Sequence, residues 1–482
     1  GLLPDDIKEE KFTGLEKSIF KVYKIYQSKI RDLNACDFGD LILYCVKLFE
    51  NYSDIKKIYN NNFKYILVDE FQDTNFIQNK WLNLLVNEKQ NICCVGDDDQ
   101  SIYSWRGAEI KNFLTFDTIY KDCKIFKLEQ NYRSTKNILE TASALISHNN
   151  GRVEKKLWSS AQQGEKVKLN CYQTGREEAE AISDIAENKL KDKYSLNNVS
   201  ILVRAIYQTR EFEERFLKIG LGYRVLGGTR FYERAEIKDA VAYLRIINQK
   251  YDDLALERVI GNPRKGIGES TLNQLYLFGN QNKLCLEESI KKNLESDNLK
   301  PKMKTSLNQL IKLIDKWRLD SKTNKHYDLL KIVLDESGYS EMLKNKKDLE
   351  NENRLENIKE LLRAMHDYDD LQSFLEHVAL ATATDKEWEG EKINLMTMHA
   401  AKGLEFDVVF LPGWEEGLFP HQKSLEEKGD SGLEEERRLA YVGITRAKKE
   451  VYLSFAMKRS YHGEWMDALP SRFINEIPDE NV

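Results

Sequence analysis

Two groups of polar side chains follow apolar segments at a spacing that suits metal and phosphate chemistry. Asp69 and Glu70 come directly after the apolar run 66–68, and Gln100 follows a second apolar run, 92–95. Both runs have the length and composition of buried parallel strands. Because ligands bind at the carboxyl ends of such strands, we expect these side chains to face one crevice. A carboxylate there, with phosphate oxygens and water, is a typical ligand set for Mg²⁺.

Acidic residues after a strand are also common in solvated loops, so Asp69 and Glu70 alone indicate little. Their context is more specific. The chain carries DEFQDTN from Asp69 and GDDDQSIYSWRGA from Gly96, separated by the length of a helix and a strand. This order resembles the Walker B segment and the third motif of superfamily 1A DNA helicases of the UvrD, PcrA and Rep type.

The resemblance implies an ATP site between two RecA-like domains. Asp69 would hold Mg²⁺, Glu70 would activate or orient the attacking water, and Gln100 would contact the γ-phosphate. Arg133, in LEQNYRS, and Arg446, in EEERRLAYVGITRAKK, match the family's arginines at the γ-phosphate. A guanidinium group suits that task because it is planar and permanently charged.

Two more residues match nucleotide contacts of the family. Tyr132 would stack on adenine, although packing in a core is the alternative for any tyrosine. Glu405, in HAAKGLEF, matches the residue that contacts the ribose. The resemblance therefore implies ATP and Mg²⁺ as cofactors.

Single-stranded DNA is the second implied ligand. Tyr103 and Trp105 lie within five residues of Gln100, and exposed aromatic rings stack on any base with about 1–3 kcal/mol each. A buried role is the alternative for such alternating aromatics. Other matches are Arg106 in the third motif, Thr397 and His399 in the fifth, and His462, which stands beside Tyr461 where the family usually has Phe or Tyr.

A Gly-Ile-Gly turn resembles a helix-hairpin-helix element. Arg264, Gly266 and Gly268 lie in NPRKGIGEST, and small residues allow backbone N–H groups to approach phosphates. The turn predicts contact with duplex DNA at single-strand/double-strand junctions. A simple capped turn before a helix is the alternative.

The pattern of periodicity predicts an α/β protein with parallel sheets and a mostly α-helical insertion. By the resemblance, the sheets belong to two RecA-like parallel-sheet domains, the first incomplete, and the insertion lies in the second. Strands are expected at 66–68, 92–95, 125–128, 167–172, 199–203, 393–396 and 408–411. Helices are expected at 14–34, from 37 to 64, and at 177–190, 236–248, 254–260, 306–320 and 355–369. By resemblance, the domains are a remnant of the helical 1B subdomain (1–35), the C-terminal part of 1A (36–123), the first part of 2A (124–226), the 2B insertion (227–388) and the second part of 2A (389–482).

Composition limits the other possibilities. The 482 residues are too many for one core, and 32% of them are charged. No apolar run approaches the ~20 residues that a membrane helix needs. The net charge of −6 argues mildly against nucleic-acid binding, although a DNA track can be local on an acidic protein. Seven cysteines without CxxC spacing indicate neither a disulfide framework nor a zinc site, so we expect a cytoplasmic location with reduced thiols.

The phosphate-binding sequence GxxxxGK[ST] does not occur in these 482 residues, which start at Gly1. We therefore expect the C-terminal portion of a larger helicase, inactive alone because its phosphate loop is missing. The family implies ATP-dependent 3′-to-5′ unwinding and translocation on single-stranded DNA in repair or replication, with repair or replication proteins as partners. The alternative is a fragment that binds DNA or a partner protein and never hydrolyses ATP.

Overall fold

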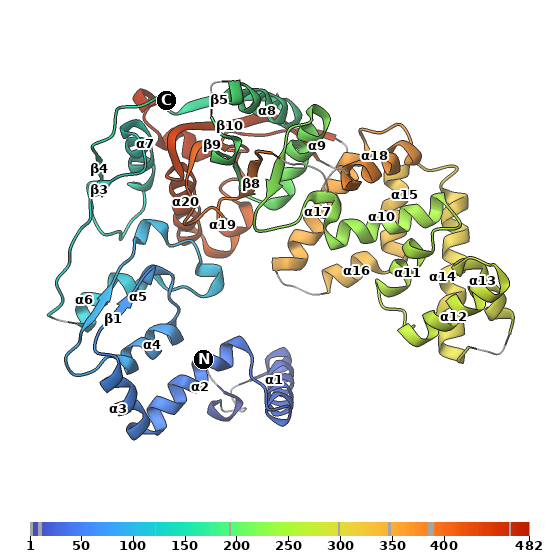
Figure 1. Ribbon diagram of the computed structural model, residues 1–482, viewed down its shortest axis with the longest axis horizontal. Coiled ribbons are helices and arrows are strands. Elements are labelled where there is room, and N and C mark those ends of the chain that lie inside the picture. The colour runs from blue at the N-terminus through green and yellow to red at the C-terminus, as the bar shows by residue number, and fades with distance from the viewer. Residues whose placement is uncertain are drawn as a thin grey trace. The chain divides into compact units, whose positions relative to one another are not determined.

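A computed structural model describes residues 3–7, 12–120, 122–191, 194–296, 299–345, 349–383, 390–461 and 464–481 (Figure 1). The chain forms two compact units. Unit 1 contains residues 1–131, 145–158 and 427–442, and unit 2 contains residues 132–144, 159–426 and 443–482. The mixed α/β class with parallel sheets and many helices is confirmed.

Unit 1 begins with helices and continues with a small sheet. Its elements are α1 (Gly14–Asp32), α2 (Phe38–Asn51), α3 (Ser53–Asn62), β1 (Ile66–Val68), α4 (Phe76–Leu85), β2 (Ile92–Cys94), α5 (Ile110–Leu114), α6 (Phe116–Ile119) and β3 (Gln130–Asn131). Asp37 is the N-cap of α2, because its side chain accepts a hydrogen bond from the Asp40 backbone N–H at 2.8 Å. The expected helix from 37 to 64 is two helices, since the backbone of Tyr52 leaves the helical region between them.

Strands β1 and β2 pair in parallel, with Ile66 opposite Ile92 and Val68 opposite Cys94. The prediction that they are buried is wrong for one face, where Leu67 is 79% exposed. Within the described part of the chain this sheet has only two strands, so no neighbouring strand covers its edges. An apolar sequence predicts the strand, but burial depends on what packs against it.

The predicted strand at 125–128 does not form. Ile125, Phe126 and Leu128 are between 67% and 85% exposed, and the chain becomes a strand only at β3. A strand needs a hydrogen-bonded neighbour, which apolar residues alone do not provide.

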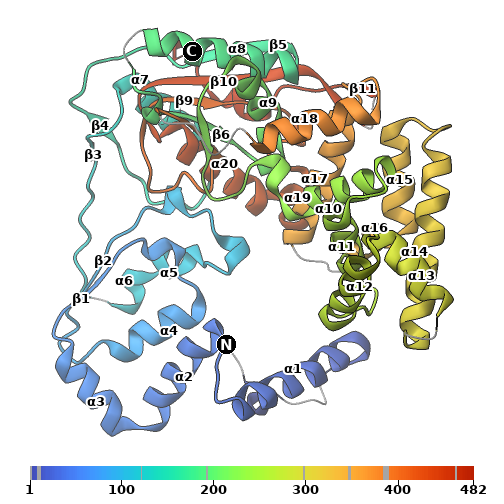
Figure 2. The same cartoon turned by 45° about the vertical axis from the view of Figure 1, so that its right-hand side comes forward.

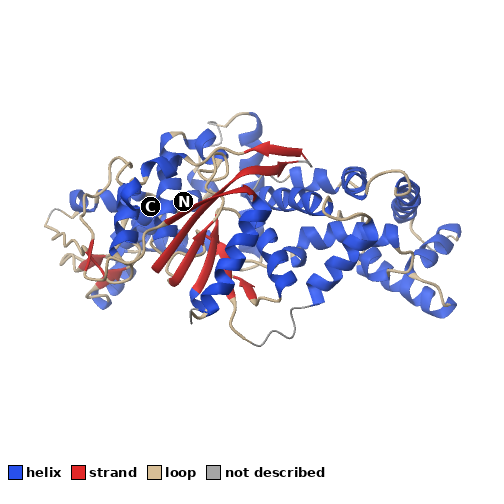
Figure 3. Cartoon of the chain, turned by 90° about the horizontal axis from the view of Figure 1, so that it is seen from above, coloured by secondary structure: helices blue, strands red, loops and turns tan. Residues whose placement is uncertain are grey.

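Unit 2 is built on a seven-stranded sheet, whose strands are drawn in red in Figure 3. Its strands are β5 (Lys168–Thr174), β6 (Val199–Val203), β7 (Tyr223–Val225), β8 (Ile393–Thr397), β9 (Phe406–Leu411), β10 (Ala447–Tyr461) and β11 (Glu464–Asp467). The order is β11-β10-β9-β6-β8-β7, and β5 also pairs with β10. Among the strand pairs that the structure describes in this sheet, the pair of β10 and β11 is antiparallel and the others are parallel. Helices α8 (Gly175–Lys191) and α9 (Thr209–Ile219) pack on it through a core that includes Ile201, Phe216 and Phe410. Strands β6, β8 and β9 are almost wholly buried, which explains their continuous apolar runs.

Between β7 and β8 the chain is helical (Figure 2). The helices are α10 (Ala235–Asn248), α11 (Asp253–Gly261), α12 (Glu269–Asn282), α13 (Leu286–Glu295), α14 (Pro301–Asp320), α15 (His326–Glu336), α16 (Tyr339–Lys344), α17 (Leu349–Met365) and α18 (Leu371–Ala383). They share a core around Trp317, Tyr243 and Phe374, each 0% exposed. The predicted helical insertion therefore has an apolar interior of its own.

The other α-helices and strands of the described residues are α7 (Lys136–Ile146), β4 (Trp158–Ser159), α19 (Gln422–Lys428) and α20 (Asp430–Ile444). The larger part of α20 belongs to unit 1 by its contacts. Among the helices that could be described, none is both long and apolar enough to cross a membrane.

Candidate functional site

Asp69 and Glu70 lie exposed at the carboxyl end of β1, as the sequence predicted. Glu70 has a left-handed backbone (φ 51°, ψ 41°), which is uncommon for a residue with a side chain and concentrates at functional sites. The Asp69 carboxylate accepts a hydrogen bond from the Glu70 backbone N–H at 2.9 Å. Its other oxygen has no protein partner among the described residues, so one exposed carboxylate oxygen is open to a cation, which fits an Mg²⁺ ligand.

Gln72 is a site residue that sequence reasoning missed. It is 0% exposed, and its amide nitrogen donates to Glu70 Oε2 at 2.6 Å. Its amide oxygen accepts from the Asp97 backbone N–H at 3.0 Å. One buried amide thus connects Glu70 to the loop that follows β2. Its burial could not be read from DEFQDTN, because glutamine is an unusual residue at a fully buried position.

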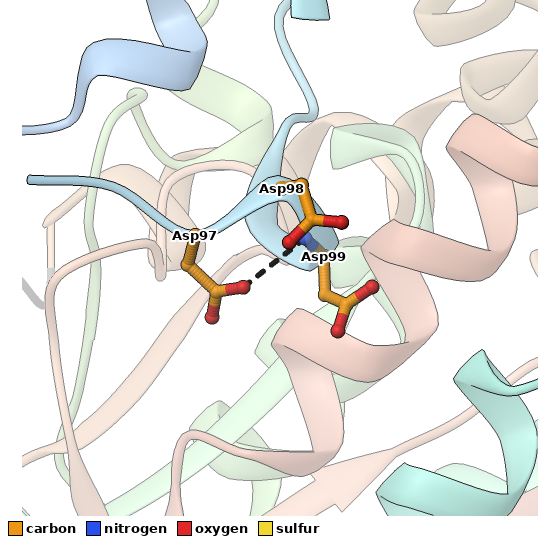
Figure 4. A group of neighbouring side chains, drawn as sticks. All are labelled: Asp97, Asp98 and Asp99. Atoms are coloured by element: carbon orange, nitrogen blue, oxygen red, sulfur yellow. Dashed lines mark hydrogen bonds between the residues drawn. The ribbon is translucent and has the colours of Figure 1, made fainter. Parts of the chain in front are cut away.

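Three consecutive aspartates follow β2 and have carboxylate oxygens within 4.8 Å of one another (Figure 4). Asp97 accepts hydrogen bonds from Gln100 Nε2 at 2.7 Å and from the Asp99 backbone N–H at 3.1 Å. Asp98 and Asp99 are 3% and 2% exposed. Asp97 therefore fixes the side chain of Gln100, the predicted γ-phosphate contact.

Lys155 provides the positive charge for this cluster. Its ammonium group contacts Asp97, Asp98 Oδ1 at 3.2 Å and Asp99 Oδ2 at 2.8 Å. Burial lowers the pKa of Lys155, but the three carboxylates outweigh burial and raise that pKa well above its ordinary value. Arg152 adds a bidentate pair to Asp99, with distances of 3.0 and 2.5 Å. Two basic side chains already pair with the three carboxylates, so the cluster does not fit a metal ion as Asp69 does. Nothing in the sequence pointed to either basic residue.

The predicted base-stacking pair lies beyond Gln100. The ring centroids of Tyr103 and Trp105 are 6.3 Å apart at 62°, and Trp105 is 46% exposed. The guanidinium carbon of Arg106 lies 5.2 Å from the Tyr103 ring and 4.6 Å from the Trp105 ring. This cation–π arrangement fixes the two rings relative to each other. Trp105 is not a core residue, which removes the alternative for that residue.

In unit 2, the predicted nucleotide residues Arg133 and Glu405 contact each other, with 2.9 Å between Arg133 Nε and Glu405 Oε2. Lys448 lies 2.7 Å from the other oxygen of Glu405. Hydrogen bonds from Lys448 and Arg133 lower the pKa of Glu405 to about 2. A second bond, at 3.3 Å, joins Arg133 Nη1 to the carbonyl oxygen of Thr445.

Arg446 is 2% exposed and donates to the Leu404 carbonyl at 3.3 Å and to Thr445 Oγ1 at 3.2 Å. Arg133 and Arg446 are thus tied to the same short segments, 404–405 and 445–446. Tyr132 is 82% exposed, so its ring is not a core residue. Unit 2 therefore brings together Arg133, Glu405 and Arg446.

The predicted DNA contacts in unit 2 have different environments. Thr397 ends β8 and its hydroxyl accepts from the Ala400 backbone N–H at 3.2 Å, while His399 is half-buried in the turn that follows. His462 lies outside the described residues. Arg264 is exposed, Gly266 has a left-handed backbone (φ 75°), and Gly268 is the N-cap of α12. A β-carbon at either glycine would meet no neighbouring atom, so the space beside this turn is open.

A cavity of about 1140 Å³ in unit 2 contains none of the predicted site residues. Its walls include the buried Arg210 and the partly exposed Arg459, each of which pairs with carboxylates. Arg459 pairs with Glu178 and Glu415, and Arg210 pairs with Glu360. We assign no ligand to this cavity.

Comparison with known proteins matches both parts of the chain to one family. The family model described as UvrD/REP helicase N-terminal domain matches residues 1–121, and the one described as UvrD-like helicase C-terminal domain matches residues 126–458. A protein of Rickettsia felis named probable DNA helicase II homolog is 46% identical over 484 residues, which cover 100% of this chain and 74% of that protein. A protein of Staphylococcus epidermidis named ATP-dependent DNA helicase PcrA is 38% identical over 486 residues, 99% of this chain and 66% of that protein.

Proposed function

The chain belongs to the UvrD-like family of DNA helicases, and from that premise we propose that it supplies most of the ATP- and DNA-handling residues of a 3′-to-5′ helicase and single-strand translocase. One observation carries the proposal: Gln72 hydrogen-bonds both to Glu70 and to the backbone of the loop that presents Gln100, Tyr103 and Trp105. A change at the nucleotide is thereby linked to the DNA-stacking rings through one buried amide.

For ATP, Asp69 holds Mg²⁺, which supplies charge neutralisation at the phosphates. Glu70 accepts a proton from the attacking water, and Gln100 contacts the γ-phosphate from its position on Asp97. Arg133 and Arg446 neutralise charge on the transferred group. The two remaining residues bind the nucleoside: the exposed ring of Tyr132 stacks on adenine, and Glu405 accepts from the ribose.

For DNA, Tyr103 and Trp105 stack on bases of the single strand, and Arg106 supports both rings. Phosphate and sugar contacts come from Thr397 and His399, with His462 as a further base contact. The turn with Arg264, Gly266 and Gly268 contacts duplex phosphates at a single-strand/double-strand junction. We propose the five segments 1–35, 36–123, 124–226, 227–388 and 389–482 as the subdomains that carry these sites, with a cytoplasmic location and repair or replication proteins as partners.

The polypeptide as printed contains no GxxxxGK[ST] sequence, so we propose that it does not hydrolyse ATP by itself. The test measures phosphate release by the purified chain with and without single-stranded DNA, beside Glu70→Gln. We expect no DNA-stimulated turnover. Robust turnover that is lost in Glu70→Gln would overturn this proposal and show that these residues are sufficient.

The alternative is a polypeptide that binds DNA or a partner protein without hydrolysis. Joining the chain to a segment that contains a GxxxxGK[ST] phosphate loop separates the two possibilities. The helicase proposal expects DNA-stimulated ATPase in the joined protein. DNA binding without any ATPase there would favour the alternative.

A further inference from the structure

The DNA-stacking rings sit on a very short structural element. Residues Ser104–Arg106 form a single 3-10 turn that Gly107 ends with a left-handed backbone. The residue before the turn, Tyr103, provides no side-chain cap for its N–H groups. A turn this short is not stable on its own, because its few internal hydrogen bonds do not offset the entropy lost when the turn is ordered. Another part of the chain must hold it.

Glu435 of α20 supplies the missing cap. The Ser104 backbone N–H donates to Glu435 Oε1 at 3.0 Å, and the Ser104 hydroxyl donates to Glu435 Oε2. A carboxylate at the N-terminal end of a helical turn satisfies its free N–H groups and its positive end. The cap here comes from 331 residues further along the chain.

Two basic residues near Glu435 make further hydrogen bonds with this loop and with Glu435. Lys428 Nζ lies 2.5 Å from Ser104 Oγ and 3.0 Å from Glu435 Oε2. Arg438, one helical turn beyond Glu435, donates to the Ser101 carbonyl at 2.8 Å. The loop is thus held at residue 101, next to Gln100, and again at residue 104, between Tyr103 and Trp105.

We propose that Glu435 is a positioning residue that holds Tyr103 and Trp105 in the orientation that stacks on single-stranded DNA. The inference rests on the proposed function of these two rings. Helix α20 ends at Ile444, two residues before Arg446. The helix that fixes the DNA-stacking turn therefore continues directly into the segment of the proposed γ-phosphate arginine, and a shift of α20 along its axis moves the cap.

The test compares Glu435→Ala with Glu434→Ala in the 482-residue chain. The side chain of Glu434 accepts from the Asn150 backbone N–H at 3.0 Å and does not touch the turn, so it is a control with the same change of charge. Binding of fluorescein-labelled oligo-dT is measured by anisotropy at fixed salt, and stacking is measured by quenching of a 2-aminopurine base. We expect Glu435→Ala to weaken binding about 3- to 10-fold and to reduce quenching. Removal of an acid near phosphates would by itself strengthen binding, so electrostatics alone predicts the opposite sign.

Two further variants distinguish a failure of the positioning role of Glu435 from a failure of the proposed function of the loop. Glu435→Gln keeps an acceptor for the Ser104 N–H and should fall between wild type and Glu435→Ala. Trp105→Ala tests the proposed function itself: no effect there would refute DNA stacking by this loop. A loss in Trp105→Ala together with equal behaviour of Glu435→Ala and Glu434→Ala would overturn the positioning role alone.

A second measurement does not depend on DNA. Amide hydrogen exchange at Ser104 should be about tenfold faster in Glu435→Ala, because the cap is the acceptor of that N–H. It should be unchanged in Glu434→Ala. Unchanged exchange at Ser104 in Glu435→Ala would rule out the capping contact on which the inference depends.

Discussion

Arg133 and Glu405, which are 272 residues apart in the sequence, form an ion pair with 2.9 Å between Nε and Oε2. The resemblance assigned them to different parts of ATP, the γ-phosphate and the ribose. In the structure each neutralises the other, and Lys448 shares the carboxylate. Binding of a nucleotide by either residue must therefore compete with this pair.

The pair predicts a pH dependence of stability. The pKa of Glu405 is about 2 in the folded chain against an ordinary value of 4.5. A carboxyl group with a lowered pKa stabilises the fold fully above 4.5, and that contribution decreases as the pH falls toward 2. The Glu405 side chain is 45% exposed, which limits this contribution to the free energy of unfolding to less than about 1 kcal/mol.

We expect the melting temperature of Glu405→Gln to lie below that of wild type at pH 7, and the difference between the two melting temperatures to narrow by pH 3.5. Asp407→Asn, which loses a contact to Lys449 instead, is the control; a gap that stays constant with pH would contradict the assignment.

Arg446 predicts a separation of binding from hydrolysis. In an ATP-hydrolysing protein that contains this chain, Arg446→Ala should lower kcat about 10³-fold or more, since the charge on the transferred group is no longer neutralised. Nucleotide binding, measured by fluorescence of a labelled ATP analogue, should largely survive. Arg472→Ala removes a guanidinium that pairs with Glu416 and serves as the control. If hydrolysis persists in Arg446→Ala, the arginine is not the γ-phosphate contact.

We expect that even the smallest side chain at position 96, in place of Gly96, lowers the stability of the fold. A β-carbon there would overlap Gln72 Oε1 and lie 2.9 Å from Phe113 Cε2. Gly96→Ala would therefore displace the amide that joins Glu70 to Asp97, at a cost of about 1–3 kcal/mol. Gly261→Ala is the matched control, because nothing lies within 4 Å of a β-carbon at that helical position. Calorimetry should show a lower melting temperature for Gly96→Ala alone, and equal melting of both variants would contradict the packing argument.

The sequence predicted most strands and helices of unit 2 because their burial pattern and their composition agree. Val199–Val203 is fully buried, and its apolar run marks it as a strand without reference to the rest of the chain. The segment 125–128 has a similar composition but no strand partner, so local preference was insufficient. The predicted burial of Leu67 failed for the same reason, since burial is a property of the neighbours of a strand.

Sequence motifs assigned roles to residues that would contact a ligand. They did not reveal the contacts that side chains of the site make with one another. The sequence assigned roles at ATP to Asp69, Glu70, Arg133 and Arg446 from residue type within a motif, and these roles stay predictions. Lys155 was not found, because a lysine 55 residues after Gln100 has no local signature of a buried contact. Glu435 lay within a recognised motif, but its partner Ser104 is distant in sequence. Such long-range polar contacts become visible only in the fold.

Lys155 gives the strongest prediction about stability. It is the shared cation of three aspartates, two of which are almost fully buried. Lys155→Met keeps much of the side-chain volume but removes the cation that the three aspartates share, while Arg152 still pairs with Asp99. Removal of one partner from a buried ionic cluster typically costs about 3–5 kcal/mol. We therefore expect a clear drop in melting temperature. Lys449→Met, which breaks an exposed pair with Asp407, should change the melting temperature little.

Millimolar Ca²⁺ should partly restore the melting temperature of Lys155→Met and have no such effect on Lys449→Met. The three carboxylate oxygens lie close enough to share one hard cation once the ammonium group is gone. Melting of Lys155→Met at the wild-type temperature would show that the cluster does not depend on Lys155.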